Sequence, residues 1–126
     1  MSFEAILEQI VADGPGILGV ALVGNDGLVV AQAESRPDPS AADSGSWDIP
    51  TLGVEFGRIV GDLNQTSGEM GAGGLAEVMI RLDRVTLIAS RVEDDLLLIL
   101  GLSPDGNIGK ARYLMRRDGC SIREEI

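Results

Sequence analysis

The chain has 126 residues, of which 44% are apolar and 24% charged, a balance typical of one soluble globular domain. Ten basic against twenty acidic residues give a net charge of −10, which argues against nucleic acid and membrane insertion, because nucleic acids and anionic membranes favour positive surfaces. Histidine is absent, which removes the commonest general base and most zinc sites, and the single cysteine, Cys120, suits a reducing cytosol. We therefore expect a cytoplasmic protein that holds no metal or cofactor; Asp or Glu chemistry stays open, although the usual catalytic residues are missing.

The first segment ends in a glycine-rich motif. Residues 2–13 carry apolar side chains at helical spacing and predict a helix, with Ser2 as its cap and Gly14 ending it in a left-handed turn. Residues 14–19, GPGILG, then match the G-x-G-x-x-G pattern of dinucleotide-binding proteins. That function requires a strand before the glycines and a helix after them, so that phosphate meets a helix N-terminus. Here a strand follows instead, so we interpret the glycines as a turn.

Two apolar runs, at 17–23 and 28–33, flank the sequence Asn-Asp-Gly at 25–27, a pattern that predicts a hairpin. Residues 34–48 are rich in Ser, Asp, Pro and Ala and predict a flexible insert loop. This loop contains the only tryptophan, Trp47, which we expect to hold it down before the next helix.

A long helix is predicted from Ile49 to Thr66, with Asp48 as its cap and Pro50 in its first turn. Its apolar residues are expected to share one inward face, namely Leu52, Phe56, Ile59, Val60 and Leu63. Glycines also recur every four residues, at Gly53, Gly57 and Gly61. Each costs up to about 1 kcal/mol relative to alanine inside a helix, so their register indicates close approach of another backbone. The neighbour is either the protein's own sheet or another helix.

Three further strands, at 75–82, 85–92 and 96–102, are separated by connections short enough for hairpins, so the sheet is expected to be antiparallel. The runs 96–100 and 17–23 are apolar at nearly every position, which favours central strands covered on both faces. Strands 28–33 and 75–82 then fall at the two edges.

The last helix is predicted to start at the cap Ser103-Pro104-Asp105 and to bury Ile108, Ala111, Leu114 and Met115. Its cations, Lys110, Arg112, Arg116 and Arg117, are interpreted mainly as solvated helix surface. Residues 121–126 are expected to form a loose C-terminal tail.

The edge strand 75–82 contains no proline, and Glu77 and Arg81 are its only charges. Such a weakly protected edge favours pairing with a second copy, in which Glu77 of one chain approaches Arg81 of the other. Shielding of the edge by the loop after Thr66 is the alternative. We favour the dimer, and its predicted interface comprises Leu75, Glu77, Val78, Met79, Arg81, Gly53, Gly57 and Gly61.

The whole element order resembles the roadblock / dynein light chain family. Similar local strings are GVALV at 19–23, NDGL at 25–28 and GAG at 71–73, while VTLI at 85–88 and SPDGNIGK at 103–110 resemble bacterial MglB-like regulators of Ras-like GTPases. The resemblance covers a single roadblock-type domain, 1–120. It implies an α+β, roadblock/profilin-like fold in which helices sandwich a five-stranded antiparallel sheet, in the order α-β-β-α-β-β-β-α, and a dimer with a continuous sheet.

The resemblance also implies a function. MglB-like members are non-enzymatic homodimers whose paired long helices bind a Ras-like small GTPase and modulate its GTP hydrolysis or switch conformation. Carried onto this chain, the platform is the helix 49–66, with outward residues Glu55, Arg58, Asp62 and Gln65. Other members are light-chain-like dimeric scaffolds or adaptors, which is the alternative function. A third hypothesis is a small-molecule sensor, which an apolar pocket beside Trp47 would favour.

Overall fold

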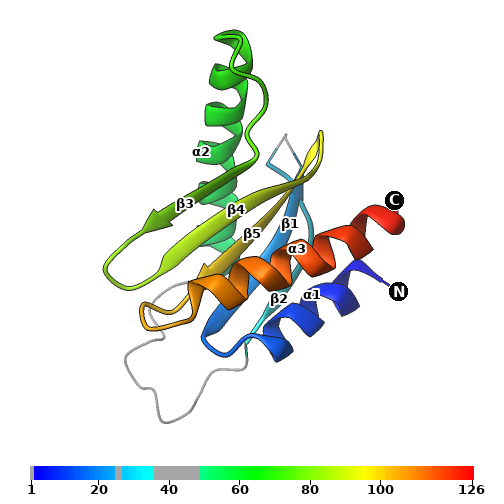
Figure 1. Cartoon of the computed structure of the whole chain (residues 1–126), viewed down its shortest axis with the longest axis vertical. Coiled ribbons are helices and arrows are strands. Elements are labelled where there is room, and N and C mark those ends of the chain that lie inside the picture. Colours follow the sequence, from blue (N-terminus) through cyan, green and yellow to red (C-terminus); the bar gives the residue numbers. More distant parts are fainter. Residues whose placement is uncertain (1, 25–26, 36–48) are drawn as a thin grey trace.

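A computed structural model describes residues 2–24, 27–35 and 49–126 and shows one antiparallel sheet with helices on both faces (Figure 1). The sheet has five strands in the order β2-β1-β5-β4-β3. In chain order the elements are α1 (Phe3–Asp13), β1 (Ile17–Gly24), β2 (Val29–Glu34), α2 (Ile49–Glu69), β3 (Glu77–Arg81), β4 (Thr86–Glu93), β5 (Leu96–Leu102) and α3 (Ile108–Glu124). The predicted fold class and element order of the protomer are confirmed.

The central and edge positions in the sheet agree with the apolar pattern. β5 pairs antiparallel with both β1 and β4, and almost every residue of β1 and β5 is buried. β2 and β3 form the two edges, and exposed side chains alternate along both of them. Continuous apolarity therefore identified the strands that are covered on both faces, as predicted.

The helices form two layers of unequal size. α1 and α3 cover one face of the sheet, and α2 alone covers the other (Figure 1). Alternate residues of β5 enter the two cores: Leu98 and Leu100 pack toward α1 and α3, whereas Leu97 and Ile99 pack toward α2. Because one helix covers a five-stranded face, the α2 side is only partly covered within the protomer.

The glycine motif at 14–19 is a turn from α1 into β1. Ile17 N donates to Gly14 O at 3.1 Å, Pro15 and Gly16 lie between them, and Gly16 has φ +87°, as in a type II turn. The left-handed residue is thus Gly16, not Gly14 as expected, because Gly14 has φ −112°. The glycines follow a helix and precede a strand, whereas a dinucleotide-binding motif requires a strand before them and a helix after them. The dinucleotide interpretation is therefore rejected.

Both ends of α3 differ from the prediction. Its cap is Asn107, whose side-chain oxygen accepts from Lys110 N at 3.0 Å, while residues 103–106 form a preceding turn closed by Gly106 N donating to Ser103 O. The expected loose tail from residue 121 is wrong as far as Glu124. Ile122 extends the apolar stripe of α3 and is fully buried in the core beneath α1 and α3, so the helix continues.

Several predicted features lie outside the described residues. These are Asn25 and Asp26 of the first hairpin turn, the insert from 36 to 48 with Trp47, and the cap Asp48. The described part of that hairpin is confirmed, because β1 and β2 pair antiparallel and Gly27 has φ +84°. The sensor hypothesis depended on a pocket beside Trp47 and stays a hypothesis.

Candidate protein-interaction site

The predicted site combines α2 with the edge strand β3. α2 lies across the far face of the sheet, and its C-terminal turns extend beyond the sheet, above the strands in Figure 1. Its buried side consists of Gly53, Phe56, Gly57 and Val60, which recur at helical spacing. The helix is therefore held along one side only.

Two of the three predicted interface glycines face the protomer's own sheet. A Cβ added at Gly57 would lie 3.3 Å from Val23 Cγ1 on β1 and 3.5 Å from Ile99 Cδ1 on β5. A Cβ added at Gly53 would lie 3.9 Å from the Cβ of Ala21. Of the two neighbours left open by the sequence, the sheet is the one these glycines contact in the protomer. Gly61 is half-buried one turn further along.

The expected inward stripe of α2 is only partly correct. Phe56 and Val60 are buried as predicted, but Ile59 is 59% exposed and Leu63 43% exposed. Viewed along the helix axis, Ile59 lies about 100° and Leu63 about 60° from Val60, both in the same direction, at 3.6 residues per turn. The apolar stripe is thus wider than the surface that the protomer's sheet covers, and its flank is open to solvent.

The four predicted partner-binding residues all lie on the exposed side of α2: Glu55, Arg58, Asp62 and Gln65. Arg58 and Glu55 form a 3.5 Å ion pair with both side chains more than half exposed, a geometry that contributes little to stability. Gln65 donates to Glu69 at 3.2 Å. The structure brings the four residues onto one outward strip.

The two flanks of α2 face opposite edges of the sheet. A Cβ added at Gly27 would lie 3.7 Å from Arg58 Cγ, so the flank carrying Arg58 faces the β1–β2 turn. Ile59 and Leu63 lie on the other flank of the helix, across the buried face from Arg58. They consequently lie on the flank toward β4 and β3, where β3 forms the edge of the sheet.

β3 is an edge strand whose two sides differ. Val78 and Ile80 are half-buried against the core under α2, while Glu77, Met79 and Arg81 point to the α3 side and are exposed. Within the described residues, β3 pairs only with β4. Its outer backbone groups are therefore available for pairing with another strand.

Glu77 already has a partner in the protomer. Its carboxylate accepts from Arg112 Nε on α3 at 2.9 Å, a contact the sequence did not suggest. The predicted contact with Arg81 of a second copy therefore has to compete with this ion pair. Glu77 is about one-third exposed and Arg112 somewhat less than half exposed, so the pair is weak enough to rearrange.

α2 ends at Glu69, three residues later than predicted, and the segment that follows it enters β3 without covering its outer edge by backbone hydrogen bonds among the described residues. Leu75 N donates to Asn64 Oδ1 at 2.6 Å, and Ala76 O accepts from Arg91 N at 2.9 Å. Both bonds connect the end of the loop to α2 and β4. Leu75 itself is half-buried against the core under α2.

A second network lies at the other side of the molecule and joins two helices. Arg117 Nη2 on α3 donates to Asp13 Oδ2 on α1 at 2.8 Å and to Asp118 Oδ2 at 2.9 Å. The hydrogen bond from Arg117, with a second one from Gln9, holds the pKa of Asp13 below its ordinary value of 3.8. The sequence predicts solvated surface for Arg117, because nothing in the spacing shows that the end of α1 lies beside it.

The described ranges show no cluster of three or more His, Cys, Asp or Glu side chains with metal-binding geometry. They also include no helix that is both long and apolar enough to span a bilayer.

No protein-family model and no curated protein matches the chain, but solved structures do. MglC from Myxococcus xanthus is 28% identical with a TM-score of 0.71, and the match covers 100% of both chains. A Roadblock/LC7 domain from Streptomyces avermitilis has a TM-score of 0.75 at 17% identity, over 99% of this chain and 98% of that one. Myxococcus xanthus MglB has a TM-score of 0.76 at 13% identity, over 96% of this chain and 84% of that one.

The fold is therefore that of a roadblock-type domain. Within that class, the predicted resemblance to MglB-like proteins is confirmed, with MglC as a similar structure at the level of sequence as well as fold.

Proposed function

We propose that the chain forms a homodimer through β3 and the open flank of α2. The paired α2 helices then bind a Ras-like small GTPase and modulate its GTP hydrolysis or switch conformation. The partner class comes from the resemblance to MglB-like regulators, supported by the similarity to MglC and MglB. The protein acts without catalytic residues of its own, by holding the partner's switch segments.

The observation that carries the dimer is the open apolar flank of α2. Ile59 and Leu63 are substantially exposed on a helix whose adjoining side is fully packed, and Met70, just beyond its end, is 78% exposed. Contiguous exposed apolar side chains mark interaction surfaces in soluble domains. This flank faces the unpaired edge of the sheet, so one two-fold axis brings strand to strand and helix to helix.

The partner surface follows from the same arrangement. With the apolar flanks in contact, the outward strip of Glu55, Arg58, Asp62 and Gln65 stays exposed on each protomer. Its charged and amide groups suit a polar recognition surface around the dimer axis. Gly53 and Gly57 support the platform by seating α2 close to the sheet.

The first experiment measures assembly. Ile59→Asp combined with Leu63→Asp is expected to convert the dimer to a folded monomer in sedimentation, because four carboxylates would face each other across the axis. Tyr113→Asp is the matched control, since Tyr113 is also 59% exposed but lies on α3, on the other face. A wild-type protein that sediments as a monomer at micromolar concentration contradicts the proposal.

The second experiment measures GTP hydrolysis by a Ras-like partner with and without the protein. Stimulation is expected, and it should disappear in the monomeric double variant. Tight binding with an unchanged hydrolysis rate and an unchanged switch conformation would instead support the scaffold alternative. Arg58→Ala distinguishes mechanisms: an arginine finger is worth about 10³-fold or more in rate. We expect a loss below tenfold, consistent with positioning of the partner's switch segments.

A further inference from the structure

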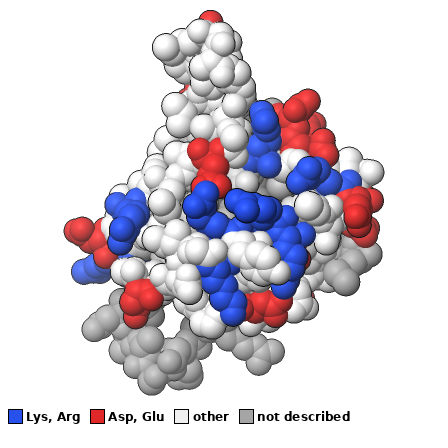
Figure 2. All heavy atoms as spheres, in the orientation of Figure 1, with Lys and Arg blue, Asp and Glu red and all other residues white. Residues whose placement is uncertain are grey.

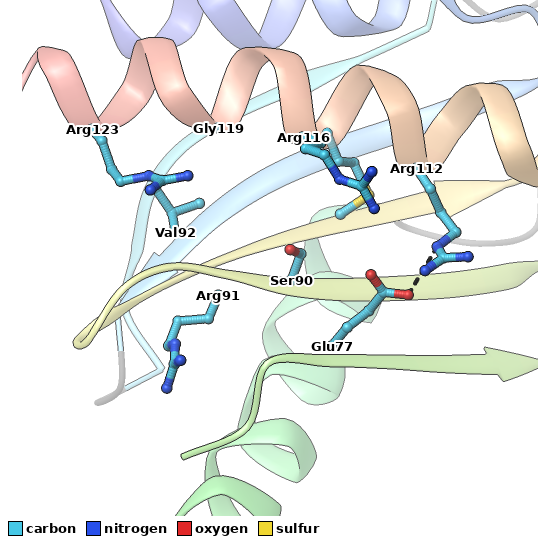
Figure 3. Close-up of a pocket in the computed structure, with 9 residues that line it drawn as sticks. Glu77, Ser90, Arg91, Val92, Arg112, Arg116, Gly119 and Arg123 are labelled. Atoms are coloured by element: carbon cyan, nitrogen blue, oxygen red, sulfur yellow. Dashed lines mark ion pairs between the residues drawn. The ribbon is translucent and has the colours of Figure 1, made fainter. Parts of the chain in front are cut away.

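A small pocket lies on the opposite face of the sheet from α2, between α3 and the strands β3 and β4 (Figure 3). It measures about 80 Å³. Its lining includes Ser90 and Val92 of β4 and, from α3, Met115 and several arginines. None of these residues contributes to the proposed GTPase platform.

The rim of the pocket is basic. Arg112, Arg116 and Arg123 occur at intervals of four and seven along α3 and so lie on one side of the helix, facing the pocket (Figure 3). Only Arg112 forms an ion pair, with Glu77; among the described residues Arg116 and Arg123 form none. The three guanidinium groups of α3 and the Glu77 carboxylate sum to +2, without counting Arg91, which also lines the pocket.

This charge is local and opposes that of the chain. The protein carries −10 overall, yet basic side chains gather in a band over α3 and β4 (Figure 2). Arg91 also borders the pocket, but its side chain points away from the three α3 arginines (Figure 3). At physiological salt, charges are screened beyond about 8 Å, so a bound group would respond mainly to these nearby arginines.

Gly119 keeps the pocket open. It lies inside α3, between the turns that carry Arg116 and Arg123, and it is buried. A Cβ added there would meet no heavy atom within 4 Å, so packing does not require glycine at this position. A glycine inside a helix costs about 1 kcal/mol relative to alanine. Here that cost preserves empty space beside Arg116 and Arg123, neither of which forms an ion pair among the described residues, although Arg123 Nη2 donates to Cys120 Sγ at 3.8 Å.

We propose that this pocket binds a phosphate dianion. Guanidinium groups recognise phosphate oxygens through paired hydrogen bonds, and a charge of +2 matches a dianion. The Ser90 hydroxyl, directed toward α3, supplies one more donor at the floor (Figure 3). A cavity of about 150 Å³ holds benzene, so 80 Å³ accommodates one phosphate group and not a whole nucleotide.

Calorimetric titration with inorganic phosphate, against acetate at equal ionic strength, tests the proposal. The wild type is expected to bind phosphate at least tenfold more tightly than acetate. Arg116→Gln removes one guanidinium and Gly119→Leu fills the pocket, and each should weaken phosphate binding at least tenfold. Both replacements are good helix formers, and unfolding midpoints show that the variants are folded. Arg84→Gln, an exposed arginine in the β3–β4 turn, is the charge-matched control and should bind like the wild type.

A second titration distinguishes two sources of the phosphate. Binding of a short phosphoserine peptide at least tenfold tighter than that of inorganic phosphate assigns the pocket to a phosphorylated segment of a partner protein. Equal or weaker peptide binding assigns it to a free phosphate. Equal binding of phosphate and acetate, or unchanged phosphate binding by Arg116→Gln and Gly119→Leu, overturns the proposal. Arg116 and Gly119 lie outside both the α2 platform and the β3 edge, so a failure of this proposal leaves the proposed function standing.

Discussion

The two buried glycines of α2 are expected to respond differently to the same substitution. Gly53→Ala gains about 1 kcal/mol of helix propensity, and its new methyl group would make an ordinary contact, 3.9 Å from the Cβ of Ala21. Gly57→Ala gains the same propensity, but its methyl group would lie 3.3 Å from Val23 and 3.5 Å from Ile99. Both neighbours are nearly fully buried in central strands and have little room to move.

The magnitudes follow from packing. Inserting a methyl group into a filled core costs about 1–3 kcal/mol, which equals or exceeds the propensity gain. We therefore expect Gly53→Ala to raise the free energy of unfolding by about 1 kcal/mol and Gly57→Ala to leave it unchanged or lower it by up to about 2 kcal/mol. Urea denaturation of both variants and the wild type, compared at two matched protein concentrations, measures the difference.

Two results would refute this reasoning. Equal stabilisation by both substitutions would mean that α2 is not seated closely on β1 and β5 at Gly57. A Gly53→Ala effect that grows with protein concentration would mean that the glycine faces a second copy, as the sequence allowed, and not Ala21 of its own sheet.

Two further predictions concern stability. Phe56→Ala is expected to cost about 3–5 kcal/mol in urea denaturation, because Phe56 is 3% exposed between α2 and the sheet; a cost below about 1 kcal/mol would contradict that packing. The lowered pKa of Asp13 contributes stability that is present above pH 3.8 and lost as the pH falls through the lower folded value. Arg117→Gln should therefore flatten the loss of stability below pH 3.8, measured by thermal unfolding across a pH series; an unchanged acid profile would show that this pair is not formed.

Much of the fold could be predicted because apolar patterning reports burial directly. Continuous apolar runs identified β1 and β5 as central strands, and short polar connections fixed the antiparallel order. Helix ends were less accurate. Ser103 and Asn107 are both good caps, and the choice depends on where the chain leaves β5, which local sequence does not record.

The site was predicted less completely, because periodicity identifies an apolar side chain but not what covers it. Ile59 and Leu63 match the buried stripe of α2 in sequence, yet both lie on a flank of the helix that the protomer leaves exposed. The basic pocket was missed for a related reason. Arg112 and Arg116 resemble solvated helix surface until the tertiary structure places Gly119 beside them and β3 across from them.

The 2.9 Å bond between Glu77 and Arg112 gives the two faces of this domain a shared element. The Glu77 carboxylate can pair either with Arg112 of its own chain or, in the proposed dimer, with Arg81 of a second copy. If an anion in the pocket takes over Arg112, Glu77 is released toward the seam between the two sheets, and occupancy tightens the dimer. By thermodynamic linkage the dimer then binds the anion with higher affinity than the monomer does. Anion binding and dimerisation would each favour the other.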